Sequence, residues 1–355
     1  MRILAAISGG VDSAVAAARL VAAGHQVTGM YMNLFDRPGG GDGSEDAAAV
    51  ARALGIPFEV WDLREEFGAR VMDYFVDAYG RGLTPNPCVR CNRRLKFGEV
   101  LDRALARGFD AVATGHYANV RVNAETGRTE LSRAAFMKKD QSYFLAVAGP
   151  ERLAHAVFPL GPVPSKQAVR EEAERDGLPV AHKAESNDIC FIPDGDTAGF
   201  LRSHLGERPG DIVDQEGSVI GHHRAAYAFT VGQRRGLHLD RVAEDGRPRY
   251  VTGVDVPAGI VRVGPAQALA VPRFTGLDPV WYREPPEELD CLVQVRAHGT
   301  PFPAHVVVVS DDTDSTAGTT RLEIVPETPL RGLASGQAAV LYDGDLVIAE
   351  ATIAR

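Results

Sequence analysis

The sequence contains no apolar run that approaches the roughly 18–20 residues needed to cross a bilayer as a helix. The apolar start, residues 1–7, is too short for a signal peptide, because the polar stretch Ser8-Gly9-Gly10 follows at once. Cysteine is scarce, and four in 355 residues do not form a disulfide framework. We therefore expect no membrane contact and a cytoplasmic location, where the four cysteines are thiols.

An excess of basic residues is also missing. Thirty-eight Lys and Arg stand against 47 Asp and Glu, which gives a net charge of −9. A nucleic-acid site must therefore be a local basic patch rather than the whole surface. The composition, 45% hydrophobic and 24% charged, is that of a globular protein, and 355 residues are enough for two or three domains of roughly 100–200 residues.

The first half of the chain alternates short apolar runs with helical stretches. The runs predicted as buried strands are 3–7, 26–32, 58–63 and 111–114. In four segments the apolar residues recur with the 3.6-residue period of a helix: 14–23, 47–54, 65–79 and 94–107. This alternation predicts an α/β fold with a parallel sheet that helices cover on both faces. Such sheets bind ligands at the carboxyl ends of their strands, so the loop after the first strand is a candidate site.

The pattern changes near residue 195. One helical stretch, 197–205, is followed by short segments rich in β-branched residues and separated by Gly and Pro turns. The predicted strands there are 211–213, 249–254, 260–263, 292–296, 304–309, 321–325 and 338–341. We therefore predict an N-terminal α/β domain over residues 1–199, a central β-rich domain over 200–270 and a C-terminal β-barrel-like domain over 271–355.

Between the first strand and an Ala-rich helix lies the segment Ser8-Gly9-Gly10-Val11-Asp12-Ser13. Its glycines allow a tight turn close to an anion, its serines offer hydroxyl groups, and the helix start favours a phosphate. Because Asp12 repels phosphate, we expect it to help hold a Mg²⁺ ion that bridges phosphates. An ordinary strand-to-helix turn is the alternative.

This segment resembles the PP-loop of ATP pyrophosphatases, which split ATP into AMP and pyrophosphate. The Gly-Lys-Ser/Thr ending of P-loop enzymes is absent from the chain, and this turn lacks the Rossmann glycine pattern. The resemblance implies an ATP site made of Ala6, Ile7, Ser8, Gly9, Gly10, Val11, Asp12, Ser13, Met32 and Gly115, with Mg²⁺ on Asp12. For Met32, core packing is the alternative.

Cys88 and Cys91 form a C-x-x-C pair, and Cys190 lies far along the chain. Such a pair suggests half of a zinc site or a redox dithiol, but the sequence has no second pair with suitable spacing. Residues 81–107 carry seven Lys or Arg and two acidic residues, which favours thiolates and suits a polyanionic substrate. A solvated helix face is the alternative for part of this charge. Cys291 is predicted to pack within a strand.

A set of motifs resembles one family, the tRNA-specific 2-thiouridylases. The likeness covers essentially the whole chain, in the family's order. It rests on Asn86-Pro87-x-x-x-Cys91-Asn92, Thr114-Gly115-His116-Tyr117, residues 138–144, Cys190-Phe191-Ile192, residues 229–236 and Ser335-Gly336-Gln337. Each motif alone is weak, whereas the ordered set is specific.

The resemblance implies an enzyme that replaces the C2 oxygen of the wobble uridine of tRNA with sulfur. ATP adenylates that oxygen, and a persulfide sulfur then displaces AMP. Cys190 matches the persulfide carrier, Cys91 the second catalytic cysteine, and Asp12 joins the catalytic set. Whether Cys91 attacks the persulfide or only resolves it afterwards stays open. Cys88 stands where some relatives carry Asp. It could substitute for Cys91, or it could form a disulfide that is not part of the catalytic reaction.

The same resemblance implies a tRNA-binding set that consists of Asn86, Pro87, Cys88, His116, Lys139, Asp140, Gln141, Arg296, Ala297 and Gln337. A packed histidine is the alternative for His116, and a capped helix start is the alternative for Lys139 to Gln141. The C-terminal domain then binds tRNA, and the basic face is expected where it meets the N-terminal domain. Reaching a base in the anticodon loop requires splaying it from its stack.

The implied partners are tRNA, through its anticodon loop, and a protein that donates persulfide sulfur, and we expect a monomer. Two other functions stay open. A PP-loop synthetase that acts on a free metabolite would need neither β-rich RNA modules nor two cysteines. A persulfide carrier or zinc-binding adaptor without activity would leave the loop at Ser8 to Ser13 unexplained. An iron–sulfur cluster on the three thiols is a further alternative to a sulfur-carrying thiol.

Overall fold

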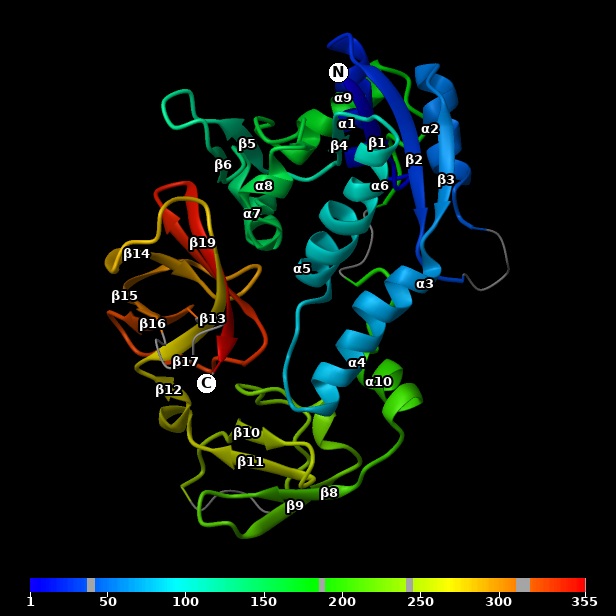
Figure 1. The fold of residues 1–355 in the computed structure, drawn as a ribbon. Coiled ribbons are helices and arrows are strands. Elements are labelled where there is room, and N and C mark those ends of the chain that lie inside the picture. Colours follow the sequence, from blue (N-terminus) through cyan, green and yellow to red (C-terminus); the bar gives the residue numbers. More distant parts are fainter. Residues whose placement is uncertain (37–41, 185–188, 241–244, 311–319, 355) are drawn as a thin grey trace.

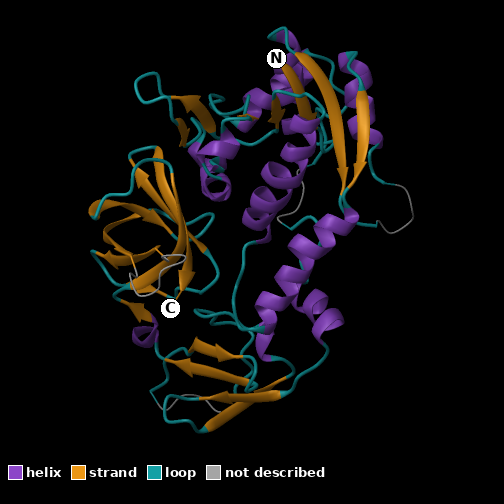
Figure 2. Ribbon diagram, in the orientation of Figure 1, coloured by secondary structure: helices purple, strands orange, loops and turns teal. Residues whose placement is uncertain are grey.

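The computed structural model describes residues 1–36, 42–184, 189–240, 245–310 and 320–354. Three parts surround helical segments at the centre of the molecule (Figure 1). An α/β part contains the N-terminus, a small sheet lies at the opposite end, and a β-barrel lies beside both (Figure 2). An α/β part followed by two β-rich parts confirms the predicted fold class. Within the described residues, no helix is both long and apolar enough to cross a membrane.

The α/β part is built on a parallel sheet with the strand order β3-β2-β1-β4-β7. Its strands are β1 (Arg2–Ala6), β2 (Gln26–Asn33), β3 (Phe58–Asp62), β4 (Ala111–Ala113) and β7 (Ala156–Val157). Successive side chains of β1 enter two different cores: Leu4 belongs to one apolar cluster, and Ile3 and Ala5 belong to the other. The sheet is therefore buried on both faces, as the continuous apolar runs predicted.

Two groups of helices cover this sheet. On the side of Ile3, the Ala-rich α1 (Val11–Ala22) packs with α2 (Glu45–Leu54) and α9 (Lys166–Arg175). The other side is covered by two helical segments, each with a π-helical stretch (η1, η2). The first consists of α3 (Arg64–Phe67), η1 (Gly68–Met72) and α4 (Asp73–Gly80), and the second of α5 (Pro87–Cys91), η2 (Asn92–Val100) and α6 (Leu101–Ala106).

The second helical segment begins seven residues before the predicted start at residue 94. Asn86 caps it, because its Oδ1 accepts hydrogen bonds from the N–H groups of Cys88 (3.0 Å) and Val89 (3.2 Å). Pro87 occupies the first helical position, where its missing N–H costs no hydrogen bond. This cap places Cys88 and Cys91 on one helix.

The small sheet follows α10 (Thr197–Leu205) and has the order β10-β11-β8-β9. Its strands are β8 (Gly210–Val213), β9 (Val219–His223), β10 (Tyr250–Asp255) and β11 (Ile260–Gly264). The sequence predicted three of them and missed β9, whose glycine and two histidines weaken the strand signal.

Six strands close into the barrel: β13 (Phe274–Trp281), β16 (Thr320–Pro326), β15 (Phe302–Ser310), β14 (Glu288–Gln294), β18 (Ala338–Asp343) and β19 (Leu346–Ala354). β13 pairs with β16 on one side and with β19 on the other, and the second pairing closes the ring. The sequence predicted neither β13 nor β19. The strand β14 was predicted, but it begins four residues before the predicted start at 292.

The remaining elements are short: β5 (Asn119–Val122), β6 (Thr129–Ser132), η3 (Met137–Lys139), α7 (Ser142–Leu145), η4 (Ala146–Ala148), α8 (Pro150–Leu153), η5 (Ala226–Ala228), η6 (Ala266–Leu269), β12 (Ala270–Val271) and β17 (Leu330–Arg331). The hairpin of β5 and β6 belongs to the α/β part but extends the barrel sheet, because Ser132 pairs with Leu346. The Tyr143 hydroxyl also donates to the carbonyl of Ala338 (3.0 Å). The barrel is thus joined to the α/β part by buried hydrogen bonds.

Candidate active site

The loop after β1 folds tightly around the hydroxyl of Ser13. The main-chain N–H of Ser8 donates to Ser13 Oγ (3.1 Å), and Ser13 Oγ donates to the carbonyl of Gly10 (2.9 Å). Gly9 has a φ of 74°, in the left-handed region that favours glycine. The first N–H groups of α1 have no partners within the helix, so this turn suits a phosphate.

Gly115, after β4, lies against the start of α1. A Cβ at this position would lie 2.7 Å from the main-chain N of Ser13 and 2.8 Å from the main-chain carbon of Asp12. Only glycine fits so close to another backbone. The structure therefore brings Gly115 to the predicted ATP residues that follow β1. The half-buried Met32 lies near the carboxyl end of the adjacent strand, β2.

Residues that the sequence analysis missed surround the carboxylate of Asp12. Its two oxygens accept hydrogen bonds from Lys166 Nζ (2.6 and 2.7 Å), and Oδ1 also accepts one from the Tyr117 hydroxyl (2.7 Å). Lys183 Nζ donates to the carbonyl of Gly9 (3.0 Å). Lys183 also pairs with Asp46, as Lys166 does with Asp12. Two ammonium groups, each paired with a carboxylate, therefore lie at the loop where a polyphosphate would bind.

These contacts bear on the Mg²⁺ ion predicted at Asp12. Among the residues that the structure describes, no group of three or more His, Cys, Asp or Glu side chains could hold a metal ion. In nucleotide sites, however, Mg²⁺ keeps several waters and takes one or two carboxylates together with substrate phosphates. Asp12 therefore fits an ion that arrives with ATP, for which its ion pair with Lys166 would have to open.

Cys91 and Cys88 differ in their exposure to solvent. Cys91 is buried, and this burial raises the pKa of its thiol to about 12, although Lys96 acts in the opposite direction. Cys88 is half-buried. Cys190 is exposed as a whole residue, yet desolvation by the surrounding protein also raises the pKa of its thiol. The charges of Cys88 and Cys190 raise the pKa of Cys91, and that of Cys88 raises the pKa of Cys190, which indicates that cysteines distant in sequence approach one another in the fold.

The residue after Cys190 anchors it. The ring of Phe191 packs against Phe67 and Phe75 at centroid distances of 5.7 and 5.5 Å, and against Phe200 at 5.2 Å. Phe191 shares its apolar cluster with Cys91. This packing anchors the residue after Cys190 on α3, α4 and α10.

Lys96 connects the cysteines to the phosphate loop. Burial dominates the pKa values of Cys91, Cys190 and His116, and the charge of Lys96 lowers all three. His116 in turn follows Gly115, which contacts the start of α1. Lys96 is therefore a functional candidate to which the sequence analysis assigned no role of its own.

His116 is enclosed by aromatic side chains. Its ring centroid lies 6.3 Å from that of Phe97 and 5.9 Å from that of Phe158, and its Nδ1 is 2.6 Å from Thr114 Oγ1. Burial lowers the pKa of His116 well below its usual value, so the imidazole is neutral at pH 7. Its surroundings are those of a packed histidine, and its contact with tRNA stays a prediction.

The predicted RNA-binding segment from Lys139 to Gln141 makes structural contacts. The buried Asp140 accepts hydrogen bonds from Arg133 Nη1 (3.2 Å) and from the main-chain N–H of Ala134 (2.9 Å). Gln141 Oε1 accepts one from the N–H of Tyr117 (2.9 Å). Lys139 ends the turn η3. Contacts of these residues with tRNA stay a prediction.

Of the predicted residues in the barrel, Gln337 lies closest to the cysteine helix. Its Nε2 donates to the carbonyl of Thr84 (2.6 Å), two residues before Asn86. Asn86 and Gln337 line one small cavity together with Arg93 and Glu350.

Arg296 and Ala297 are the other two barrel residues of the predicted tRNA-binding set. Both make hydrogen bonds to residues of the barrel domain. Arg296 donates to the carbonyl of Gly332, and the carbonyl of Ala297 accepts from Gln294 Nε2 (3.1 Å).

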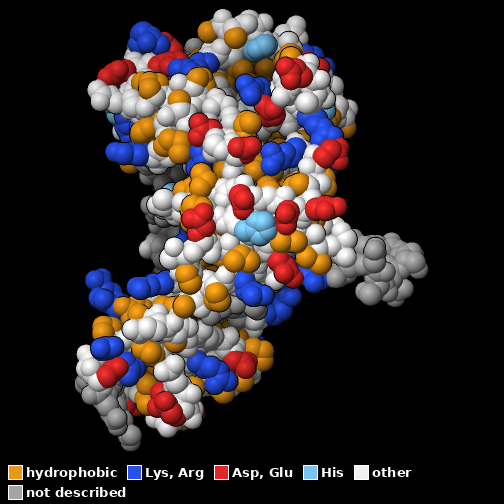
Figure 3. Space-filling view, turned by 90° about the vertical axis from the view of Figure 1, so that its left-hand side faces the viewer, with side chains coloured by type: hydrophobic (Ala, Val, Ile, Leu, Met, Phe, Trp, Pro, Cys, Tyr) orange, Lys and Arg blue, Asp and Glu red, His pale blue; other side chains and the backbone are white. Residues whose placement is uncertain are grey.

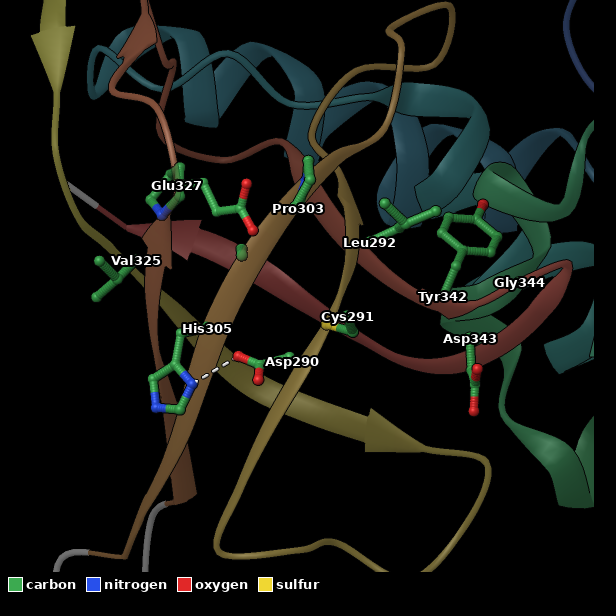
Figure 4. A pocket seen from close by; sticks show the side chains of 12 residues that line it. Asp290, Cys291, Leu292, Pro303, His305, Val325, Glu327, Tyr342, Asp343 and Gly344 are labelled. Atoms are coloured by element: carbon green, nitrogen blue, oxygen red, sulfur yellow. Dashed lines mark hydrogen bonds and ion pairs between the residues drawn. The ribbon is translucent and has the colours of Figure 1, made fainter.

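A pocket of about 600 Å³ lies on the barrel (Figure 4). It is lined by Cys291 and by His305, whose Nδ1 is hydrogen-bonded to Asp290 Oδ1 (2.9 Å). None of its lining residues belongs to the predicted site. Cys291 lies in β14, as predicted, and desolvation raises the pKa of its thiol to about 12. This cysteine therefore serves as a reference thiol outside the site.

Charge is mixed on the face that Figure 3 shows. Lys and Arg side chains are interspersed there with Asp and Glu. This face does not match the concentrated basic face that the sequence predicted, which stays a prediction for other faces of the molecule.

Three family models match the chain in order. They are described as a tRNA methyl transferase HUP domain (residues 1–194), a tRNA methyl transferase PRC-barrel domain (residues 198–265) and an aminomethyltransferase beta-barrel domain (residues 272–353). Together they follow the succession of α/β part, small sheet and barrel in the structure.

Similar proteins carry one name. The tRNA-specific 2-thiouridylase MnmA of Beutenbergia cavernae is 55% identical, and the alignment covers 100% of this chain and 95% of that protein. The proteins of the same name from Acidothermus cellulolyticus and Kocuria rhizophila are 52% and 51% identical, over 100% and 99% of this chain and 98% and 97% of their own lengths.

A solved structure, the U34-tRNA thiolase NcsA from Methanococcus maripaludis, is 18% identical over 58% of this chain and 64% of that one, with a TM-score of 0.34. A score this low supports no inference. The full-length relatives and the family models agree, and they confirm the resemblance seen in the sequence motifs. The chain therefore belongs to the family of tRNA-specific 2-thiouridylases.

Proposed function

We propose that this protein uses ATP to replace the C2 oxygen of the wobble uridine of tRNA with sulfur. The observation that carries the proposal is the continuity of the site. Gly115 packs on the start of α1, the adjoining His116 is affected by the charge of Lys96, and that charge also acts on Cys91 and Cys190. The shared influence of Lys96 supports the assignment of the phosphate loop and the two thiols to one centre, as a coupled adenylation and sulfur transfer requires.

In the first step, O2 of the uridine attacks the α-phosphorus of ATP, and the bond from that phosphorus to pyrophosphate breaks. An amide-like carbonyl oxygen leaves poorly, whereas the AMP formed on it leaves well. Ser8, Ser13 and the N–H groups at the start of α1 bind the phosphates, and Lys166 and Lys183 balance the charge that develops on pyrophosphate. Asp12, with its ion pair to Lys166 opened, would hold the Mg²⁺ ion, which supplies further positive charge.

In the second step, Cys190 holds the sulfur to be transferred as a persulfide. The Cys91 thiolate attacks Sγ of Cys190, so that a Cys91–Cys190 bond forms and the outer sulfur leaves as sulfide. Sulfide attacks C2 of the base, and the bond from C2 to the AMP oxygen breaks. The two thiols lose two electrons, which the transferred sulfur gains. The exposed Cys190 suits loading by a separate persulfide-donor protein.

The tRNA-binding set predicted from the sequence completes the proposal, with the anticodon loop entering between the cysteine helix and the barrel. Asn86 and Gln337 line one cavity at this boundary, which supports that placement. A monomer suffices, since both cysteines and the phosphate loop come from one chain.

The test follows the oxygen atom that leaves. Unmodified tRNA with ¹⁸O at C2 of the wobble uridine is incubated with the protein, ATP, Mg²⁺ and a persulfide donor. We expect ¹⁸O in AMP and 2-thiouridine in equal amounts. With a synthetase that acts on a free metabolite, ¹⁸O would stay in the tRNA and adding tRNA would not stimulate pyrophosphate release. A carrier without activity would release no pyrophosphate. Either result would overturn the proposal.

A further inference from the structure

We propose that Cys88 is a third catalytic cysteine, which regenerates Cys190 after each turnover by moving the disulfide from Cys91–Cys190 to Cys88–Cys91. This inference rests on the proposed function, whose second step leaves Cys91 and Cys190 joined. Cys190 cannot accept another sulfur atom until that bond is opened.

The first argument is the position of Cys88 on the helix. Cys88 and Cys91 are three residues apart in α5, and residues with this spacing are neighbours on a helix surface, with Cβ atoms roughly 5–6 Å apart. The cap fixes this first turn, since the N–H of Cys88 donates to Asn86 Oδ1 (3.0 Å). Disulfides need Cβ atoms about 3.5–4.5 Å apart, so the pair can close when this first turn of the helix tightens by about 1–2 Å.

The second argument is the position of Cys88 relative to Cys190. The residues on both sides of Cys190, Ile189 and Phe191, pack on the apolar cluster that contains Cys91. Next to desolvation, the charge of Cys88 has the largest effect on the pKa of the Cys190 thiol. The helix thus places Cys88 beside Cys91, and this electrostatic effect supports an approach of Cys88 to Cys190 as well.

The third argument is solvent exposure, which gives the exchange a direction. Cys88 is half-buried, Cys91 is buried and Cys190 is exposed. If Cys91 left as a thiolate, its charge would remain in an apolar core, where burial raises its pKa to about 12. Desolvation raises the pKa of the Cys190 thiol as well, but Cys190 is the more exposed of the two residues, so its thiolate is the less costly one to form. Because the better-stabilised thiolate leaves faster, attack on Cys91 is favoured.

The exchange balances without an oxidant. The Cys88 thiolate attacks Sγ of Cys91, a Cys88–Cys91 bond forms, and the Cys91–Cys190 bond breaks. Its electron pair leaves on the sulfur of Cys190, which takes up a proton from water and becomes a thiol that can be loaded again. An external dithiol then supplies two electrons and two protons and returns Cys88 and Cys91 to thiols.

The experiment maps disulfides in a Cys291→Ser background, which removes the reference thiol outside the site. The protein is loaded with persulfide, allowed one turnover with tRNA and ATP without reductant, quenched in acid, alkylated and digested. We expect the Cys88–Cys91 disulfide with Cys190 alkylated in this protein, and the Cys91–Cys190 disulfide in the additional Cys88→Ser variant. A Cys91–Cys190 disulfide with Cys88 alkylated in the protein that retains all three thiols would overturn the inference.

A second measurement separates this inference from the proposed function. The resting protein is titrated with oxidised glutathione, without tRNA or ATP, and its disulfides are mapped. We expect Cys88–Cys91 as the main intramolecular bond. The tRNA of the first experiment is analysed for 2-thiouridine as well. If it contains none, the proposed function fails, and the titration still decides the inference. A main bond between Cys190 and either helix cysteine would overturn the inference.

Discussion

At the scale of single residues, the site depends on lysines brought in from distant segments. Lys166 and Lys183 reach the phosphate loop from beyond β7, and the charge of Lys96 acts on both Cys91 and His116. The sequence analysis identified the loop and the cysteines because their motifs are local. It missed Lys166 and Lys183 because an ion pair between residues 12 and 166 leaves no trace in the spacing of either segment.

We predict that Lys96→Met slows the alkylation of Cys190. Loss of the positive charge raises the pKa of that thiol further, so less thiolate is present at pH 8. Interaction of two charges near a protein surface is worth about 1 kcal/mol or more, which corresponds to a roughly three- to tenfold lower rate. Iodoacetamide labelling followed by peptide mass spectrometry measures this rate. Arg52→Met, which removes an exposed charge of α2, is the control, and equal rates in both variants would contradict the role of Lys96.

At the scale of elements, the strand β4 and the helix α1 must meet without side chains between them. We predict that Gly115→Ala destabilises the protein by about 1–3 kcal/mol, because a methyl group would press on the main chain of Asp12 and Ser13. The same displacement should weaken ATP binding. Urea denaturation and nucleotide titration measure the two effects.

Gly68→Ala is the matched control for Gly115→Ala. Gly68 lies in the helical stretch η1, and a Cβ there meets no atom within 4 Å. Alanine favours a helix over glycine, so this variant should be as stable as the parent or slightly more stable. If both substitutions had the same effect, the close approach of Gly115 would not be the cause.

The elements also show where prediction from the sequence succeeds. Parallel strands buried on both faces are continuous apolar runs, so 3–7 and 26–32 could be predicted from a single sequence. The strands that close the barrel could not be predicted, because the closure pairs β13 with β19, which lie at opposite ends of the domain's sequence. The π-helical stretches within 64–106 likewise have no local signal that the apolar period reveals.

At the scale of the whole molecule, the barrel and the cysteine helix share a buried carboxyl group. Glu350 of β19 is 2% exposed and lines the cavity with Asn86 and Arg93. Burial raises its pKa to about 7, although Arg93 acts in the opposite direction. Between pH 4.5 and 7 the folded protein therefore holds a proton that the unfolded chain has released, so stability falls as pH rises across this window.

We predict that Glu350→Gln removes this loss of stability. The expected difference between the two pH profiles is roughly 3 kcal/mol, because a proton held only by the folded protein changes its stability by about 1.4 kcal/mol for each pH unit of the window. Urea midpoints between pH 4.5 and about 8 measure the difference. Glu323→Gln, an exposed carboxyl of β16, should leave the profile unchanged. If the profile of Glu350→Gln ran parallel to that of the parent, the carboxyl would not be protonated in the folded state.

The central claim is that the phosphate loop and the cysteines act in one reaction. Nucleoside mass spectrometry tests this claim most directly. Unmodified tRNA is incubated with ATP, Mg²⁺, a persulfide donor and the parent protein, Cys190→Ser or Cys291→Ser. We expect 2-thiouridine with the parent and with Cys291→Ser, none without ATP, and none with Cys190→Ser, which should still release pyrophosphate in the presence of tRNA. Formation of 2-thiouridine by Cys190→Ser, or without ATP, would contradict the proposed reaction.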